Sequence, residues 1–182
     1  MHEKDLTALA HAAARGDRDA LTAFIQATQR DVKRFLTRMC HRSDVDDLTQ
    51  ETFLRAVRAL PGFEGRSSAR TWLFAIARRV AVDAVRHASS RPRIAALNDW
   101  QSAAPPRPDS FEEQHALQDL LDGLTPDRRE AFVLTQAAGL SYAEAAEICG
   151  CPIGTIRSRV ARAREDLVAA IDGTHPGRRL SG

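Results

Sequence analysis

The chain has 182 residues, of which 43% are hydrophobic and 27% are charged, with a formal net charge of +2. That length allows one or two small domains, and the composition is typical of a globular protein rather than a disordered one. No apolar run approaches the ~20 residues that span a bilayer. The first residues are too polar for a signal peptide, so a cytoplasmic protein is expected.

The motif content argues against an enzyme or a metalloprotein. We find no phosphate-binding loop, no dinucleotide-binding motif, no zinc-protease motif and no serine nucleophile elbow. Three cysteines, Cys40, Cys149 and Cys151, are too few for a disulfide framework, and the last two lack the spacing of a zinc site. Residues 44–47 lack the glycine and the final glutamate of a calcium loop. We expect no catalytic residue, no metal and no cofactor.

Helical periodicity defines the first predicted domain, residues 1–88. A short helix is expected over residues 3–15, and apolar stripes predict further helices over about 21–39, 45–60 and 68–88. No segment alternates with a period of two, so an all-α fold is expected. The positions predicted to face inward are Leu21, Phe24, Ile25, Thr28, Val32, Phe35, Leu36 and Met39, then Val45, Leu48, Thr52, Ala56 and Val57, then Trp72, Leu73, Ile76, Ala77, Val80 and Ala84.

Residues 89–110 are predicted to be a flexible linker, because they hold four prolines and no apolar repeat. Helical patterning resumes at Phe111, so residues 111–172 form the second domain and 173–182 a frayed tail. One helix is expected to end near Leu124. The next begins at Thr125, an N-cap followed by a proline, and ends at Gly139.

A helix-turn-helix is predicted in the second domain. Ser141 and Glu144 form a capping box at the start of a short helix that closes at Gly150, and a longer helix runs from about Pro152 to Ile171. A short helix, a glycine-containing turn and a second helix are typical of this DNA-binding motif.

The second of these helices is basic on one side. No acid occurs from Pro152 to Arg164, and the helix carries Arg157, Ser158, Arg159 and Arg162. Arginines in the first turns of a recognition helix can pair with guanine in the major groove. An apolar stripe of Ile153, Ile156, Val160, Ala163 and Leu167 is expected to pack inward. The alternative is an ordinary solvated amphipathic helix.

A second basic region lies between Phe63 and Arg93, where seven arginines accompany only two acids. Arginine interleaved with Phe63, Trp72 and Phe74 favours binding of unstacked single-stranded nucleic acid. The alternative for Trp72 is a core position, because it lies on the predicted apolar stripe.

The helix expected over residues 45–60 begins with a cluster of acids. Asp47, Gln50, Glu51 and Leu54 share one of its faces. This face is either a protein-docking surface or simply a helix N-terminus whose acids offset the helix dipole.

Three stretches together resemble an extracytoplasmic-function (ECF) sigma factor of the sigma-70 family. The core-polymerase-binding segment of that family resembles residues 46–56, DDLTQETFLRA, and its promoter-melting helix resembles residues 67–78, SSARTWLFAIAR. Its helix-turn-helix resembles residues 140–146, LSYAEAA, together with residues 154–164, GTIRSRVARAR. The match covers nearly the whole chain except the linker and the tail.

The resemblance implies an all-α factor with a sigma-2-like and a sigma-4-like domain. Its expected partners are promoter DNA and core RNA polymerase, through the β′ clamp helices and the β flap, and it allows for an anti-sigma protein. The first domain would bind polymerase through Asp47, Gln50, Glu51 and Leu54. It would open the −10 element through Phe63, Ser67, Ser68, Arg70, Trp72, Arg78 and Arg79. The second domain would bind the −35 duplex through Thr155, Arg157, Ser158, Arg159 and Arg162.

One position departs from the family pattern. Many members have asparagine where this chain has Arg79, which shifts the expected role from base reading toward phosphate contact.

Two other interpretations remain open from the sequence. A helix-turn-helix repressor or activator would explain residues 112–171 but not the acidic and arginine-aromatic helices, and a redox enzyme would rest only on Cys149 and Cys151.

Overall fold

The computed structural model describes residues 3–40, 44–90 and 108–174. They form eight α-helices with one 3-10 turn and one π-helical turn and contain no strand, which confirms the all-α prediction. The elements are α1 (Glu3–Ala14), α2 (Arg18–Met39), α3 (Val45–Ala59), η2 (Leu60–Gly62), α4 (Ala69–Ser90), α5 (Pro108–Asp122), α6 (Pro126–Phe132), η3 (Val133–Ala137), α7 (Tyr142–Cys149) and α8 (Ile153–Thr174). Within the described ranges no helix has the length and apolar character needed to cross a membrane.

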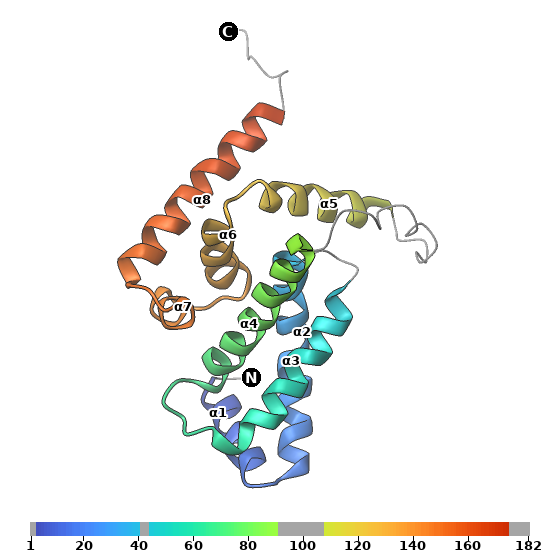
Figure 1. The fold of residues 1–182 in the computed structure, drawn as a ribbon, viewed down its shortest axis with the longest axis vertical. Helices are drawn as coiled ribbons and strands as arrows, with labels where there is room; N and C mark the ends of the chain where they lie inside the picture. The colour runs from blue at the N-terminus through green and yellow to red at the C-terminus, as the bar shows by residue number, and fades with distance from the viewer. Residues whose placement is uncertain (1–2, 41–43, 91–107, 175–182) are drawn as a thin grey trace.

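The first domain is built from α1 to α4, which lie together in the lower half of Figure 1. Its core consists of large apolar side chains from α2 and α4, and the rings of Phe35 and Phe74 meet edge to face with centroids 5.4 Å apart. The predicted stripe of α2 is correct, since every one of its positions is buried or half-buried. This stripe packs against both α3 and α4.

One inward prediction on α3 is wrong. Val57 is 40% exposed, whereas Thr49, which the apolar pattern missed, is buried. Buried positions 45, 49, 52 and 56 recur every three or four residues and make a single stripe. Val57 follows Ala56 by one residue and is therefore turned about 100° away from that stripe.

The second domain consists of α5 to α8, with α6 and α7 both packed on α8. Its core holds Leu121, Leu134, Ile156 and Val160, each at most 1% exposed. A feature the sequence did not predict is η3, a π-helical turn in which the Ala138 N–H donates to the Val133 carbonyl at 2.9 Å. This turn ends the helix before the helix-turn-helix begins.

The predicted boundaries of the linker differ slightly from those of the helices. Helix α4 continues to Ser90 and α5 already begins at Pro108, so both ends of the predicted linker, 89–90 and 108–110, are helical. Its residues 91–107 lie outside the described residues, as does the predicted tail from residue 175 onward. Figure 1 shows α6 and α7 lying beside α4, so the two domains are in contact.

Candidate nucleic-acid and polymerase interfaces

The capping box predicted at the start of the helix-turn-helix is present. The Ser141 N–H donates to the Glu144 carboxylate at 2.8 Å, and the Glu144 N–H donates to the Ser141 hydroxyl at 3.2 Å. Helix α7 then ends at Gly150, whose φ of +64° lies in the left-handed region that favours glycine. The two local signals therefore define where α7 begins and where it ends.

Helix α8 presents an exposed cationic side. Arg157, Ser158 and Arg162 are exposed, whereas Ile156, Val160 and Ala163 of the predicted stripe are buried. The Ser158 hydroxyl donates to its own helix, at the Thr155 carbonyl, over 2.9 Å. Thr155 is half-buried. The arrangement leaves two guanidinium groups directed at solvent, as groove and phosphate contacts require.

One packing prediction about α8 is wrong, and one residue expected to contact DNA has a partner within the chain. Ile153, expected in the apolar stripe, is 40% exposed, because it is the first helical residue and lies beyond the neighbouring helices. Arg159, expected on the DNA side, donates to the Asp127 carboxylate in the first turn of α6 at 2.5 Å. A second ion pair between α6 and α8 joins Arg128 to Asp166 at 2.6 Å. The contact that the structure gives Arg159 therefore holds α8 against α6.

The loop between η2 and α4 is packed rather than open. Phe63 is only 8% exposed and its ring contacts those of His11 and Trp72, with centroids 5.0 and 5.2 Å away. Gly65 has a φ of +69°, and a Cβ there would meet the His11 ring at 2.7 Å. Trp72 is half-buried against the core, as expected from the alternative prediction that it occupies a core position. The two aromatic residues thus brace the loop.

The serines of that loop have different environments. The Ser68 hydroxyl accepts from the Thr71 N–H at 3.1 Å and so caps the start of α4, while Ser67 is half-buried without such a role among the described contacts. The neighbouring Ala69 N–H donates to the Thr7 hydroxyl of α1 at 3.2 Å. Helix α1 therefore contributes directly to the start of the predicted melting helix.

The predicted DNA-contacting arginines of α4 point in two directions. Arg79 is exposed. Arg70 and Arg78 turn toward the second domain, where Arg78 makes two hydrogen bonds to the Glu130 carboxylate of α6, at 2.5 and 3.1 Å. Arg70 donates to the Ala138 carbonyl at 2.5 Å. Arg70 also pairs with Asp31 of α2 at 3.3 Å, so it contacts both domains. Arg78 is held by the second domain, and Arg79 faces solvent.

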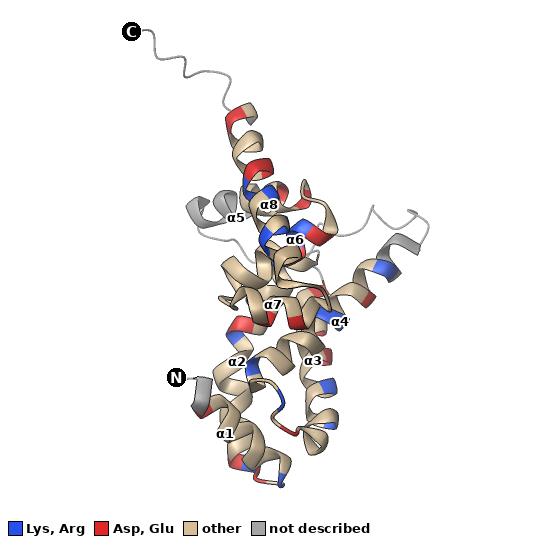
Figure 2. Ribbon diagram, turned by 90° about the vertical axis from the view of Figure 1, so that its left-hand side faces the viewer, with Lys and Arg blue, Asp and Glu red and all other residues tan. Residues whose placement is uncertain are grey.

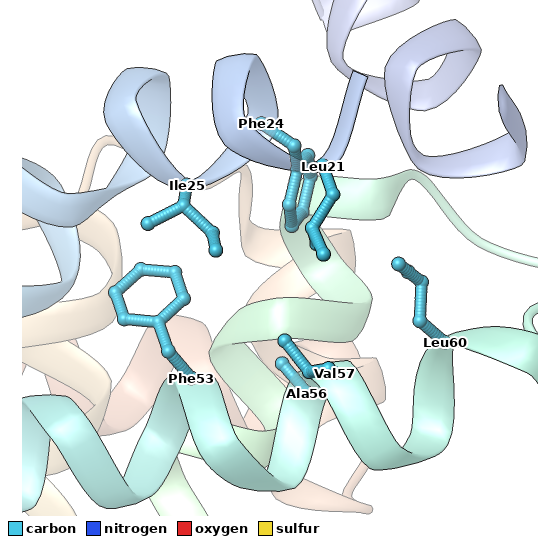
Figure 3. Close-up of a pocket in the computed structure, with 7 residues that line it drawn as sticks. All are labelled: Leu21, Phe24, Ile25, Phe53, Ala56, Val57 and Leu60. Atoms are coloured by element: carbon cyan, nitrogen blue, oxygen red, sulfur yellow. The ribbon is translucent and has the colours of Figure 1, made fainter. Parts of the chain in front are cut away.

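The acidic face of α3 is exposed as predicted. Asp47, Gln50 and Leu54 are exposed, with Leu54 at 46%, while Glu51 pairs with Arg55 at 2.7 Å. Beside this face a narrow apolar gap between α2 and α3, too small to admit a water molecule, is shown in Figure 3. The side chains that line it are Leu21, Phe24, Ile25, Phe53, Ala56, Val57 and Leu60. The exposed acids together with the exposed side chains of Leu54 and Val57 form a surface suited to another protein.

Cys40 and Cys149 are poor candidates for thiolate chemistry. Burial raises the pKa of the Cys40 thiol to about 11 and that of Cys149 to about 12, with Glu130 adding to the second shift. A raised pKa lowers the thiolate fraction and hence the reactivity. No group of three or more metal-ligating side chains occurs in the part of the chain that the structure describes.

Both domains match models of one protein family. The model described as "Sigma-70 region 2" matches residues 24–91, and the one described as "Sigma-70, region 4" matches residues 114–167. The chain therefore belongs to the sigma-70 family.

Curated relatives narrow this assignment to the ECF group. The chain is 53% identical over 169 residues to "ECF RNA polymerase sigma factor SigC" of Mycobacterium tuberculosis, covering 92% of this chain and 91% of the relative. It is 32% identical to "ECF RNA polymerase sigma-E factor" of Haemophilus influenzae, covering 87% and 90%.

Two solved structures share the fold. The chain resembles CnrH, solved in complex with the cytosolic domain of CnrY, with a TM-score of 0.77 and 27% identity over 93% of this chain and 98% of the other. It also resembles the sigma factor RpoE of Bartonella quintana, solved with the anti-sigma factor NepR. That match has a TM-score of 0.69 and 30% identity over 83% of this chain and 96% of the other.

Proposed function

We propose that this chain is an alternative sigma factor, which binds core RNA polymerase and directs it to a particular set of promoters. The observation that carries the proposal is the presence, in one chain, of both sigma-70 regions with an exposed surface of suitable charge on each. A helix-turn-helix regulator would need the second domain alone. The factor itself performs no chemistry, and it acts where polymerase is, in the cytoplasm.

Recognition of the −35 duplex is assigned to α8. Arg157 and Ser158 lie in its first two turns, where a recognition helix reaches base edges. Arg162 lies one turn beyond Ser158 and is placed to contact phosphates. We assign Arg159 to the support of α8, since its guanidinium is paired with Asp127. The β flap of polymerase is the expected protein partner of this domain.

Opening of the −10 element is assigned to the loop at residues 61–68 and to α4. Arg79 is exposed and Ser67 is accessible in part, so these two can contact a displaced strand without rearrangement. Phe63 and Trp72 must leave their packing with His11 before either can stack on a base. Extracting one base costs a few kcal/mol, which contacts with the flipped base must recover.

Docking on polymerase is assigned to the exposed face of α3. Asp47, Gln50, Glu51 and Leu54 supply polar and apolar contacts for the β′ clamp helices. Because structures of similar chains were solved with CnrY and NepR, an anti-sigma protein is a further expected partner.

Run-off transcription tests the proposal. Purified full-length factor is added to core polymerase on genomic fragments, and transcripts should start at specific sites only when the factor is present. The informative variant is Asp47→Lys, which should abolish these transcripts. Asp19→Lys is its matched control, because Asp19 is also exposed in the first turn of a helix and bears the same helix-dipole cost. Failure of the factor to copurify with core polymerase would favour the regulator instead.

A further inference from the structure

Helix α1 reaches the loop at residues 61–68 through two of its side chains. Figure 1 shows α1 beside this loop, which leads from η2 into α4. The centroid of the His11 ring lies 5.0 Å from that of Phe63, and the Thr7 hydroxyl accepts a hydrogen bond from the Ala69 N–H at 3.2 Å. The two contacts fall near the two ends of the loop, so one helix holds both of them.

The direction of these two side chains follows from the helical period of α1. Thr7 and His11 are four residues apart and therefore lie on one face of the helix. Leu6 and Ala10, each one position earlier in the chain, are 8% and 0% exposed and anchor α1 in the core. Because the core positions fix the rotation of α1, they also fix the direction in which Thr7 and His11 project.

Successive residues of the loop turn alternately toward the His11 ring and toward solvent. Phe63 is buried and contacts the ring, and a Cβ added at Gly65 would lie 2.7 Å from its Nε2 atom. Glu64 and Arg66 have side chains that are 66% and 86% exposed, and they pair with each other at 3.3 Å. Figure 2 shows an acidic and a basic stretch next to each other along this loop. The His11 ring therefore supports the inner face of a segment whose outer face is exposed.

The packing under the loop leaves it little room to shift. The φ of Gly65 is +69°, a conformation that favours glycine, and any side chain there would overlap the His11 ring. The Phe63 ring also contacts Trp72, with centroids 5.2 Å apart. Removal of the imidazole would take away the surface on which residues 63 and 65 rest. In this arrangement Phe63 supports the loop, and the groups that can meet DNA without rearrangement belong to its outer side.

The exact position of such a loop matters for reading a base more than for holding a strand. A base taken out of the stack is recognised by hydrogen bonds to its edge, and N–H···O bonds span only about 2.7–3.2 Å between donor and acceptor. A displacement of about 0.5 Å therefore weakens or breaks them. Phosphate contacts carry no sequence information, so a change in the shape of the loop should act mainly on base discrimination.

From these observations, and resting on the proposed function, we infer that His11 is a positioning residue for base recognition at the −10 element. Its ring fixes the shape of residues 63–66, while Thr7 fixes the start of α4, so that the loop accepts one base and rejects others. His11 makes no contact with DNA in this role and acts through Phe63 and Gly65.

Two pairs of variants test the two contacts of α1. His11→Ala removes the ring, and His11→Phe keeps an aromatic ring in its place. Thr7→Val removes the hydroxyl and Thr7→Ser keeps it, which provides a second test if His11→Ala fails to fold. Met39→Ala is the control for a general loss of stability, because Met39 is buried in the same domain but lies beside Val85, toward the other end of α4. All variants are made in the full chain, and urea unfolding measures their stability.

The readout is base discrimination by the factor bound to core polymerase. Anisotropy gives the Kd for a labelled −10 single strand from a promoter found by run-off transcription, and for strands with each base replaced in turn. A mismatched base weakens specific binding about five- to 150-fold, so the parent should show such a Kd ratio at one position or more. His11→Ala and Thr7→Val should lower that ratio at least about threefold, because the loop no longer stays within hydrogen-bonding range. His11→Phe, Thr7→Ser and Met39→Ala should keep the ratio of the parent.

The outcomes separate the inference from the function on which it rests. If the parent transcribes from specific promoters but a folded His11→Ala keeps every Kd ratio, the inference is overturned and the proposed function stands. Unchanged ratios in Thr7→Val overturn it in the same way if His11→Ala does not fold. An equal loss of the ratio in Met39→Ala or His11→Phe also overturns it, because general destabilisation or a different property of histidine would then be responsible. A parent that gives no promoter-specific transcript contradicts the proposed function itself.

Discussion

Substitution of two neighbouring arginines distinguishes DNA reading from structural support in α8. Arg157 is exposed without a described partner, whereas Arg159 donates to Asp127 at 2.5 Å. Removal of a bidentate base contact costs about 1–3 kcal/mol, so Arg157→Ala should weaken binding of the −35 duplex about five- to 150-fold. Arg159→Ala instead loses a partly solvated ion pair worth about 0.2–1 kcal/mol of folding stability, and its affinity should change less than about twofold.

The assay is anisotropy of a labelled −35 duplex titrated with the factor bound to core polymerase, at one fixed salt concentration. Urea unfolding of each free variant supplies the stability. Asp127→Asn separates the two roles, since a supporting pair predicts lower stability with unchanged affinity. An Arg159→Ala loss as large as that of Arg157→Ala would refute the reasoning, as would tighter binding by Asp127→Asn, because either result places Arg159 on the DNA.

Three further predictions concern the rest of the chain. Glu51→Lys should reduce the ability of the factor to compete for core polymerase while leaving its helical content unchanged. If the variant competes as well as the parent, the acids of this face serve only to offset the helix dipole. Gly150→Ala should lower the free energy of unfolding in urea by about 1–2 kcal/mol, because alanine is strained at a φ of +64°. An added Cβ would meet no neighbouring atom, so the cost comes from the backbone conformation alone. A stabilised variant would contradict this prediction. The pKa of Cys149 is raised from 9.0 to about 12, so the free energy of unfolding should hold its full value below about pH 9 and fall as the pH rises toward 12. Urea unfolding at pH 8 and at pH 10.5 should show this loss in the parent and a smaller loss in Cys149→Ser. An identical pH dependence in the two proteins would contradict the raised pKa of Cys149.

Local features of the fold were predictable because their signals lie within a few residues. The capping box depends on Ser141 and Glu144, three residues apart, and the turn depends on Gly150 alone. Burial of Ile156 and Val160 follows from helical period. The prediction failed at Val57 because its apolar character was followed instead of its position, which lies about 100° from the buried stripe of α3.

The orientation of charged side chains could not be read in this way. Arg78 and Glu130 are 52 residues apart, and nothing in either local sequence indicates that they meet. The same holds for Arg159 and Asp127, 32 residues apart. A basic helix face therefore predicts which residues are available for DNA, and only the tertiary structure shows which of them are already paired.

The support that α1 gives to the start of α4 has a practical consequence for dividing this protein. The sigma-70 region 2 match begins at residue 24, after α1 has ended. Yet His11 lies against Phe63, and Thr7 receives the first N–H of α4. A fragment cut at the family boundary would keep every expected DNA-contacting residue of the first domain while removing the scaffold of its loop. Shortened versions of the factor should therefore begin before residue 3, or strand opening will be measured on a loop that has lost its shape.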